Sequence, residues 1–441
     1  MIKSILPLSS IIALRFLGLF LVLPVISAYA INLEGATTTL VGVVVGGYAL
    51  TQMIFQVPFG VISDKLGRKG TIIMGLILFI IGSLICAMSS DIWTLVLGRF
   101  LQGAGAIGAV VTAMISDLVP EEKRPKAMAL MGGSIAMAFA ISMLAGPTIG
   151  GFFGIEILFY ITALLGVVSI FVLIKKVPNP PQITHTYNAK AKMSEVLGNA
   201  NLIKMNITNF LQKGLMTFAF MIIPMVLTRT IENGGFGWQM TDLWQVYLPA
   251  MILGVIAMGP AAVMAEKKGK FKEILIIGIV FFSASYLILG LTTSSVAFIV
   301  GVAVFFIGFN MHEPIMQSLA SKFAKVHQRG LVLGIFNSAG YLGTFIGGVV
   351  GGMFFQSASL SSIVIAIAII CVIWVILIAK MPNPAKMKFV YLPLNEYKLE
   401  NTEKLHNDLV EEWYVNNTEN IIAVKYNSET SSEEQVKALL R

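Results

Sequence analysis

Four charged side chains lie inside apolar stretches that are each about 20 residues long, the length that can cross a lipid bilayer as a helix. They are Arg15, Arg99, Lys213 and Glu313. A charge near the centre of a bilayer costs about 2.5–3.5 kcal/mol on insertion scales, so it is expected to face a cavity or a partner. These four residues are therefore the first candidates for handling protons or a solute.

Glu313 is the only carboxylate well inside such a stretch, within Phe309-Asn310-Met311-His312-Glu313-Pro314. Burial favours a protonated carboxyl and a nearby cation favours a carboxylate, so a glutamate that is alternately hydrated and paired could load and release a proton. Alternatively, Glu313 is a permanent partner of Lys213 or His312. The other proton-coupling candidates are His312, Lys213, Arg99 and Arg15.

Three of these candidates have alternative roles that the residues leave open. For His312, a proton relay competes with simple packing against a backbone carbonyl, and we expect packing. Arg99 could tune a proton site or orient a gate. Arg15 puts a positive charge in the first stretch, so we hypothesise that the cavity disfavours permanent cations and prefers neutral or anionic compounds, unless Arg15 lies outside it.

The composition identifies the membrane as the solvent of this chain. Apolar residues make up 56% of it and charged residues only 12%, against roughly 45–50% and about 25% in soluble domains. Cys86 and Cys371 each lie in an apolar stretch, so neither a disulfide nor a metal site is expected. The net charge of +8 could suggest nucleic acid as a partner, but the positions of the lysines and arginines explain it better.

Twelve transmembrane spans are predicted. Their ranges are 9–31, 40–62, 71–89, 94–117, 127–150, 157–175, 203–228, 243–265, 272–291, 296–320, 331–354 and 359–379. With the N-terminus inside, the inner loops carry the lysines and arginines and the outer loops carry only Arg229. This positive-inside bias predicts a multi-pass protein of the bacterial inner membrane with both termini in the cytoplasm.

The loop after the second span reads G-x-x-x-D-K-x-G-R-K. Its residues are Gly60, Asp64, Lys65, Gly67, Arg68 and Lys69. This pattern resembles the signature loop of the major facilitator superfamily. In that family the loop contacts span 11 and favours the outward-facing state, so the resemblance implies a gating role here. Physically, glycines permit close backbone approach, and a carboxylate is stabilised at the positive N-terminal end of a helix.

Two further motifs resemble patterns of the same superfamily. The fourth span carries R-x-x-Q-G-x-G-A, and the fifth carries the G-P-x-x-G-G core that is typical of antiporters, with Ser142 in place of the usual leading glycine. The residues are Arg99, Gln102, Gly103 and Gly105 in span 4, and Gly146, Pro147, Gly150 and Gly151 in span 5. Together with the order of features along the chain, these motifs are similar to the 12-span drug/proton antiporter branch, and closest to its YajR-type members, which bear a C-terminal ferredoxin-like domain.

The chain is divided into four parts. They are a six-helix bundle over 1–176, a cytoplasmic linker over 177–202, a second six-helix bundle over 203–380 and a polar domain over 386–441. The bundles are related by an offset of 202 residues, because Asp64-Lys65-Leu66-Gly67-Arg68 recurs as Glu266-Lys267-Lys268-Gly269-Lys270. Such repeats are typical of transporters whose substrate site lies between the halves. The predicted fold class is an all-α membrane protein with a small α+β domain.

The polar C-terminal domain is predicted to have the order βαββα. Its elements are strand 388–394, helix 402–411, strand 412–416, strand 420–427 and helix 432–440, the last with a capping box between Ser432 and Gln435. His406 is its only histidine and it has no cysteine, so metal binding is discarded. Because the domain is acidic, we expect it to dock against the basic loops or to self-associate.

The sequence as a whole predicts a proton-coupled secondary transporter that exports small molecules or drugs by alternating access. The partners implied are a small-molecule substrate, protons and the lipid bilayer, with the proton gradient as energy source and no cofactor. Phosphate-binding and nucleophile motifs are missing from the sequence, so an enzyme is not expected. The alternatives are an uptake symporter and a transporter-like sensor that signals through its C-terminal domain.

Overall fold

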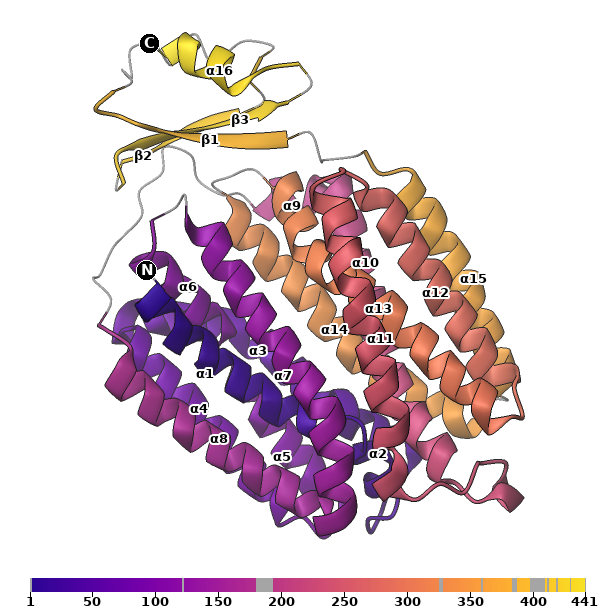
Figure 1. The fold of residues 1–441 in the computed structure, drawn as a ribbon. Helices are drawn as coiled ribbons and strands as arrows, with labels where there is room; N and C mark the ends of the chain where they lie inside the picture. Colours follow the sequence, from indigo (N-terminus) through magenta and orange to yellow (C-terminus); the bar gives the residue numbers. More distant parts are fainter. Residues whose placement is uncertain are drawn as a thin grey trace.

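The computed structural model consists of a bundle of long helices and a small sheet that lies beyond one end of that bundle (Figure 1). It describes residues 2–120, 123–179, 193–324, 328–357, 360–382, 387–396, 409–410, 412–417, 419–428 and 430–440. We call the end of the bundle next to the sheet the sheet side, and the opposite end the far side. The first residues of the chain also lie on the sheet side (Figure 1).

The helices follow the predicted spans closely. In the first half they are α1 Ile2–Leu21, α2 Ile26–Ala30, α3 Thr38–Leu66, α4 Arg68–Ala87, α5 Ile92–Ala104, α6 Gly108–Leu118, α7 Arg124–Phe153 and α8 Ile155–Lys176. In the second half they are α10 Ala200–Thr228, α11 Trp244–Glu266, α12 Phe271–Leu291, α13 Ser295–Phe323, α14 Arg329–Ser357 and α15 Leu360–Ala379. Among the described residues, eleven helices are long and apolar enough to cross a membrane, and the shorter apolar helix Ile5–Leu21 supplies the first span.

The first and fourth spans are each broken into two helices, which the sequence analysis did not predict. Pro24 lies in the turn between α1 and α2, where it has no N–H to continue the helix. The break between α5 and α6 falls at Gly105, which packs directly against the backbone of Gly75 in α4. Hydropathy predicts insertion into the membrane but not the continuity of a helix. A further short helix, α9 Met193–Gly198, lies inside the predicted linker.

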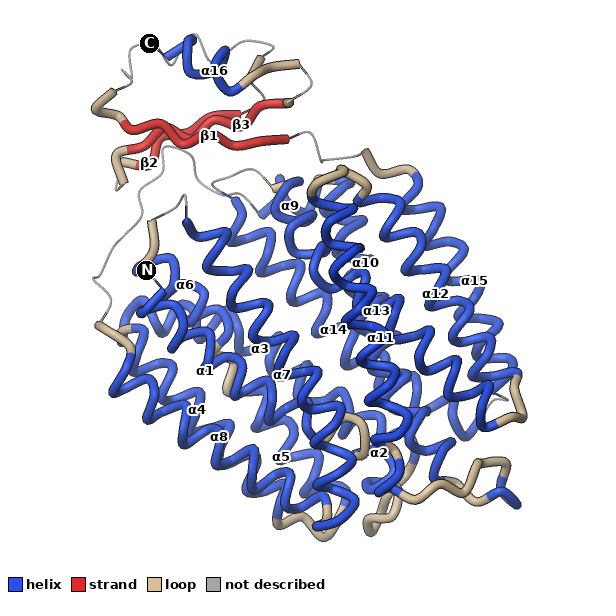
Figure 2. Tube along the Cα trace, in the orientation of Figure 1, coloured by secondary structure: helices blue, strands red, loops and turns tan. Residues whose placement is uncertain are grey.

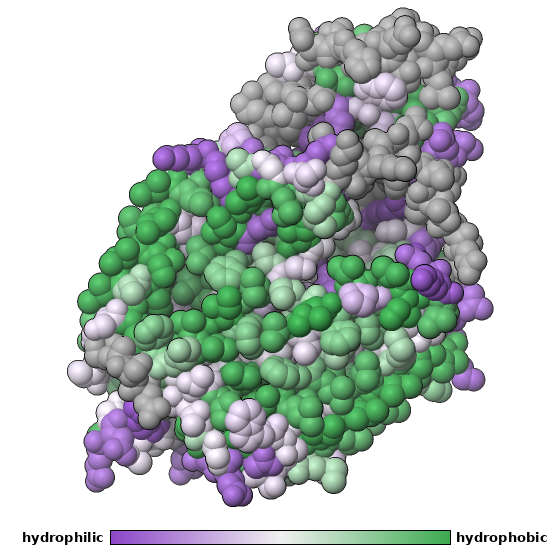
Figure 3. Space-filling view, turned by 180° about the vertical axis from the view of Figure 1, so that it is seen from behind, coloured by the Kyte–Doolittle hydropathy of each residue, from purple (hydrophilic) through white to green (hydrophobic). Residues whose placement is uncertain are grey.

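Apolar side chains cover the surface of the bundle between its two ends. The space-filling view shows a broad hydrophobic belt, with hydrophilic residues gathered toward the sheet side and the far side (Figure 3). Large side chains such as Val57, Phe171 and Val372 are more than half exposed within this belt. Exposure of this kind is expected for a surface that faces lipid rather than water.

Close backbone contact on the far side joins the two halves through α3 and α14. A Cβ atom added to Gly42 would collide with the carbonyl of Gly348, and one added to Gly352 would collide with the carbonyl of Thr38. Nearby, the hydroxyl of Ser27 donates to the carbonyl of Phe220 at 3.2 Å. Since small residues allow helices in membranes to approach closely, these glycines hold the far side shut.

The described residues of the C-terminal domain form a three-stranded antiparallel sheet and one helix that packs on it (Figure 2). Its elements are β1 Met387–Pro393, β2 Glu412–Asn416, β3 Ile421–Asn427 and α16 Glu433–Leu440, with the strand order β1-β3-β2. This order leaves β1 and β2 parallel with β3 between them, as in the split βαβ unit of ferredoxin-like folds. The predicted helix 402–411 lies almost wholly outside the described residues.

The capping box of α16 is confirmed. Ser432 N–H donates to the side chain of Gln435 at 2.8 Å, and the N–H of Gln435 donates to the hydroxyl of Ser432 at 3.2 Å. Val436 is fully buried against the sheet. The predicted fold class is confirmed by the helical bundle together with this sheet.

The glycine contact predicts that Gly348→Val opens the far side. In a Cys86→Ala/Cys371→Ala background, Ser27→Cys should react slowly with a membrane-impermeant maleimide added from the far side, because Ser27 is fully buried. Adding Gly348→Val should raise the rate several-fold, since valine cannot occupy the space at Gly42. The matched control is Gly334→Val on the same helix, where a Cβ meets open space. Equal rates for both valine variants would contradict the assignment.

Candidate functional site

Lys213 of α10 and Glu313 of α13 form an ion pair inside the second half of the bundle. The Lys213 ammonium donates to both oxygens of the Glu313 carboxylate, at 3.0 and 2.8 Å, and Gln212 adds a longer bond of 3.3 Å. The two side chains are 23% and 37% exposed. The two residues belong to different predicted spans. In the structure they are in contact, so of the two partners considered for Glu313 it is Lys213, and not His312, that pairs with it.

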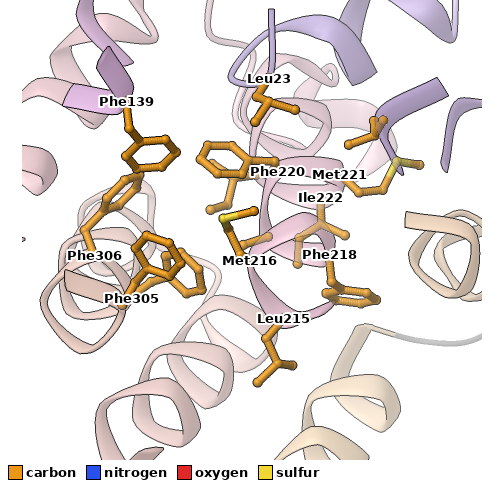
Figure 4. Close-up of a cluster of buried hydrophobic side chains, with 14 of the residues drawn as sticks. Leu23, Phe139, Leu215, Met216, Phe218, Phe220, Met221, Ile222, Phe305 and Phe306 are labelled. Atoms are coloured by element: carbon orange, nitrogen blue, oxygen red, sulfur yellow. The ribbon is translucent and has the colours of Figure 1, made fainter. Parts of the chain in front are cut away.

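An aromatic cluster lies beside this ion pair. The Lys213 ammonium is 5.1 Å from the centre of the Phe309 ring, a cation–π distance. Phe309 contacts Phe139 of α7, with the ring centres 5.7 Å apart, and Phe139 also packs edge-on against Phe220. Figure 4 shows Phe139 reaching from the first half toward Phe220 and Phe306 of the second. The ion pair therefore lies next to an apolar contact that joins the halves.

His312 is directed away from the ion pair. Its Nε2 lies 2.8 Å from the carbonyl of Leu275 in α12, and its ring packs edge-on against Phe282 and Trp374. It is fully buried. Although His312 precedes Glu313 in the sequence, consecutive residues on a helix point in directions about 100° apart. This geometry agrees with the packed role that we expected for the histidine.

Arg99 is fully buried in the first half, and its hydrogen-bond partners among the described residues are all neutral. Its Nε and Nη2 donate to the carbonyls of Val44 and Val45 at 3.0 and 3.4 Å, and its Nη1 donates to the side chain of Gln102 at 2.8 Å. Gln102 in turn donates to Ser83 of α4 at 2.9 Å. The span 4 motif thus ties α5 to α3 and α4, while its Gly103 fits against the backbone of Tyr48.

Arg15 of α1 is also fully buried, but its hydrogen bonding is incomplete. Its Nη2 donates to Gln52 at 3.3 Å and to the carbonyl of Gln102 at 3.5 Å. Within the part of the chain that the structure describes, its Nε and Nη1 have no hydrogen-bond partner. Gln52 donates to the hydroxyl of Tyr341 in α14 at 2.7 Å, which connects the two halves.

The signature loop forms a charge cluster at the sheet side. Arg68 bonds to Asp64 and, at 2.8 Å, to Asp117 at the end of α6. The side chain of Asp64 is 65% exposed, and the space around Gly60 and Gly67 is open. The close backbone approach that the loop glycines permit is therefore not used in this conformation, in which the halves meet on the far side.

The repeated loop in the second half has a similar cluster. Glu266 at the end of α11 bonds to Lys322 of α13 at 2.7 Å and also accepts a bond from Ser318. Both clusters lie at the sheet-side ends of their helices, but their contacts are not equivalent. The offset of 202 residues carries Asp64 onto Glu266, whereas it carries Asp117 onto Leu319 rather than onto Lys322. The loop motif is therefore repeated, and its partners differ between the halves.

The span 5 motif packs at the far side. Gly146 lies against the carbonyl of Leu21, where α1 breaks, and Gly151 lies against the backbone of Thr241 in the second half. Pro147 lies within α7 between them, and Gly150 contacts Leu158 of α8. Ser142, which replaces a glycine of the motif, donates to the carbonyl of Leu17 at 3.2 Å. Its hydroxyl is accommodated by bonding rather than by a shift of the helix.

Sequence reasoning missed Gln52, Asp117 and Tyr341. Polar residues inside or at the end of an apolar span gave a usable signal for the first two. Tyr341 gave no such signal, because a tyrosine in a span can also be explained by the enrichment of tyrosine at membrane–water interfaces. Among the described residues, no group of three or more histidine, cysteine or acidic side chains could hold a metal ion.

Comparisons with known proteins agree with this arrangement. The sequence model of the Major Facilitator Superfamily matches residues 8–348 and 260–391. The chain is 35% identical to the inner membrane transport protein YajR of Escherichia coli (strain K12), over 86% of this chain and 83% of that protein. It is 27% identical to the quinolone resistance protein NorA of Staphylococcus aureus, over 88% of this chain and 98% of that protein.

Solved structures show the same fold at low sequence identity. A bacterial homolog of the human lysosomal transporter Spinster, in an inward-facing and occupied conformation, matches with a TM-score of 0.68 and 13% identity, over 86% of this chain and 97% of that one. The nucleoside transporter NupG matches with a TM-score of 0.65 and 14% identity, over 86% and 99%. At this identity the likeness concerns the fold alone.

The contacts of Arg99 predict that Arg99→Lys destabilises the first half. The planar guanidinium donates to the carbonyl of Val44, the carbonyl of Val45 and the side chain of Gln102. A lysine ammonium cannot reach all three of these acceptors, so the carbonyl of Val44 and the side chain of Gln102 lose a charge-assisted bond. We expect a loss of about 1–3 kcal/mol in the free energy of unfolding, measured in detergent. The control is Arg229→Lys in the loop that follows α10 on the far side, where the arginine lies over the Phe355 ring. A loss no larger than the control's would contradict this role.

Proposed function

Because the chain belongs to the major facilitator superfamily, we propose that it is a proton-coupled antiporter that exports small molecules by alternating access. Its halves, residues 1–176 and 203–380, would move against each other about a substrate site between them. The structure has its halves joined on the far side, which corresponds to one of the two states that alternating access requires. The single observation that carries the proposal is the partly exposed pair of Lys213 and Glu313.

This ion pair has the properties of a proton-loading site. In the far-side-closed state the carboxylate is 37% exposed and held by the ammonium at 2.8 Å. When the pair separates, or when the site closes to water, the uncompensated carboxylate is costly and takes up a proton. A membrane potential would assist proton entry by about 2.3 kcal/mol per charge for each 100 mV. Proton uptake by Glu313 would also release Lys213 from the ion pair. Because the pair lies beside the Phe139–Phe309 contact between the halves, its protonation state would then be linked to the position of the halves.

Two observations support export rather than uptake. The span 5 motif resembles that of antiporters, and its glycines lie at the far-side contact where an exporter must open. NorA, which is similar over most of its length, is by its name a quinolone resistance protein. The same reading places the chain in the bacterial inner membrane with the sheet side and both termini in the cytoplasm, as the distribution of lysines and arginines favours.

The first test uses proteoliposomes that hold a pH gradient and a trapped pH-sensitive dye. Anionic, neutral and cationic compounds are added in turn, and we expect substrate-dependent proton leakage with wild type. Glu313→Gln should abolish the leakage because glutamine cannot carry a proton, whereas Glu313→Asp should retain part of it. Glu232→Gln, which removes an exposed carboxylate from an outer loop, is the matched control and should leak as wild type does.

The remaining outcomes separate the alternatives. Leakage that survives in Glu313→Gln would keep antiport and move the proton site elsewhere. His312→Gln, which can still donate to the Leu275 carbonyl, should retain leakage if the histidine only packs. Leakage with none of the compounds would favour a sensor, and substrate accumulation in the direction of proton flow would show a symporter.

We further propose that the C-terminal domain docks on the sheet side of both halves. Glu419, beside β3, bonds to Arg124 at the start of α7. The Lys425 ammonium of β3 donates to the carbonyl of Lys322 at 3.1 Å at the end of α13. The turn before β3 therefore contacts the first half, and β3 itself contacts the second half. Docking of this kind would favour a particular separation of the halves on the sheet side.

A charge exchange tests the docking. Arg124→Glu and Glu419→Arg should each speed proteinase K cleavage between the bundle and the sheet several-fold, because each places like charges together. The double variant should return the rate toward wild type. Rates that do not change in the single variants would contradict docking, and protection that depends on protein concentration would indicate self-association instead. Proton leakage by a chain ending at residue 382 would favour transport over signalling through the domain.

A further inference from the structure

Arg15 is a buried cation that faces no carboxylate in the part of the chain that the structure describes. Two of its nitrogens, Nε and Nη1, lack a hydrogen-bond partner there, and the bonds of its Nη2 to Gln52 and Gln102 are long, at 3.3 and 3.5 Å. The rings of Phe16 and Phe79 lie 5.8 and 5.4 Å from its guanidinium carbon. Buried charges are normally paired, so an arginine in this state is suited to a partner that comes from outside the chain.

A second cation adds to the positive potential around Arg15. Arg99 donates to the side-chain oxygen of Gln102, and Arg15 donates to the main-chain oxygen of the same residue. Two fully buried guanidinium groups thus lie around one neutral glutamine. The two cations repel each other, and this repulsion is strong where water is excluded. An anion at Arg15 would be attracted by both guanidinium groups and would offset their repulsion.

Tyr341 supplies a neutral donor from the other half of the molecule. Its hydroxyl oxygen accepts the 2.7 Å bond from Gln52, so its own O–H remains available to donate. An acidic oxygen between Arg15 and Tyr341 would accept from both and would take the place of the Gln52 amide. Because Arg15 belongs to α1 and Tyr341 to α14, such a group would contact both halves.

A row of aromatic rings extends from Arg15 to the ion pair. The centres of Phe16 and Phe20 are 5.3 Å apart, those of Phe20 and Phe139 are 5.1 Å apart, and those of Phe139 and Phe309 are 5.7 Å apart. The Lys213 ammonium lies over the last ring. The row begins in α1, crosses to the second half at Phe139, and presents apolar surface between the two charged sites.

We propose that Arg15 and Tyr341 bind the acidic group of an amphipathic organic anion whose apolar body lies along the rings of Phe16, Phe20 and Phe139. This assigns a substrate class, an aromatic or otherwise lipophilic carboxylate or sulfonate, and it rests on the proposed transport function. Permanent cations are disfavoured at the same place because they would meet Arg15 and Arg99. Glu313 is left free to handle the proton at the other end of the row.

Equilibrium binding to the purified full chain in detergent tests the proposal without a proton gradient. The probes are benzoate, 2-naphthoate and biphenyl-4-carboxylate, each beside its primary amide and its aminomethyl cation, so that only the charged group changes on a fixed ring system. We expect the best acid to bind about tenfold or more tightly than its amide, the difference that a charge-assisted hydrogen bond makes. The cation should bind least tightly.

Three variants assign the preference to this site. Arg15→Gln should reduce the affinity for the acid to that for the amide, whereas Arg15→Lys, which keeps the charge, should retain part of the difference. Tyr341→Phe should weaken acid binding several-fold and leave amide binding unchanged. Arg229→Gln, which removes an arginine from an outer loop, is the control and should bind as wild type does. Because Arg15→Gln could fail to fold, Tyr341→Phe is the second, milder measurement.

The proposal is overturned if no acid of the set binds more tightly than its amide, or if the preference persists in Arg15→Gln and Tyr341→Phe. It is also overturned if chloride displaces 2-naphthoate at concentrations below those at which naphthoate itself binds, since the site would then hold an inorganic ion. These results are independent of proton coupling. Export of neutral or cationic compounds that depends on Glu313 would keep the proposed function and reject this substrate class.

Discussion

Close packing of α14 between α3 and α10 is the contact on which the rest of the site depends. Glycines lie on two sides of this helix: Gly348 meets the backbone of Gly42 in α3, and Gly347 meets the backbone of Gly214 in α10. Larger residues at these positions would push the helices apart. One side of α14 thereby brings Tyr341 to Gln52 at 2.7 Å, and the other holds the segment of α10 that carries Lys213. The two charged sites are thus placed by one helix.

The charged groups inside the bundle differ in how completely they are satisfied. Arg99 has a bond for each of its guanidinium nitrogens, all to oxygens of its own half, so it can remain unchanged while the halves move. The pair of Lys213 and Glu313 is satisfied but partly exposed, so water can reach it. Arg15 is fully buried, and two of its three guanidinium nitrogens have no hydrogen-bond partner among the described residues. Arg99, with all its bonds made, is suited to a structural role. The exposed pair of Lys213 and Glu313 is suited to the proposed proton handling, and the incompletely bonded Arg15 is suited to ligand binding.

The sequence predicted the spans and the fold class because hydropathy depends on composition over some 20 residues. It also identified Arg15, Arg99, Lys213 and Glu313 as charges inside apolar spans, since their cost in a bilayer does not depend on the fold. It did not predict the break at Pro24, although a proline without an N–H is a local signal for one. It could not predict the break at Gly105, because that break depends on the backbone of Gly75 that packs against it. It also missed Tyr341 as the residue that connects the halves, because a contact between residues 52 and 341 follows from the register of two helices. The exposure of Asp64 belongs to this far-side-closed conformation. In the proposed mechanism the same sequence also adopts a state that is closed on the sheet side, so the sequence alone does not indicate which surroundings Asp64 has.

The distance between the two charged sites bears on how a substrate and a proton could be coupled. Arg15 and Lys213 are separated by the rings of Phe16, Phe20, Phe139 and Phe309, so a direct exchange of partners would require a ligand that spans the row. The row crosses between the halves at Phe139, which packs against Phe220 and Phe309 while the far side is closed. If the halves moved as proposed, a ligand on these rings would lose contacts on one side, so its free energy would differ between the two states. In the proposed mechanism, protonation of Glu313 would also change the balance between those states. The two sites would then be linked through the shared movement of the halves, without a chain of contacts between them.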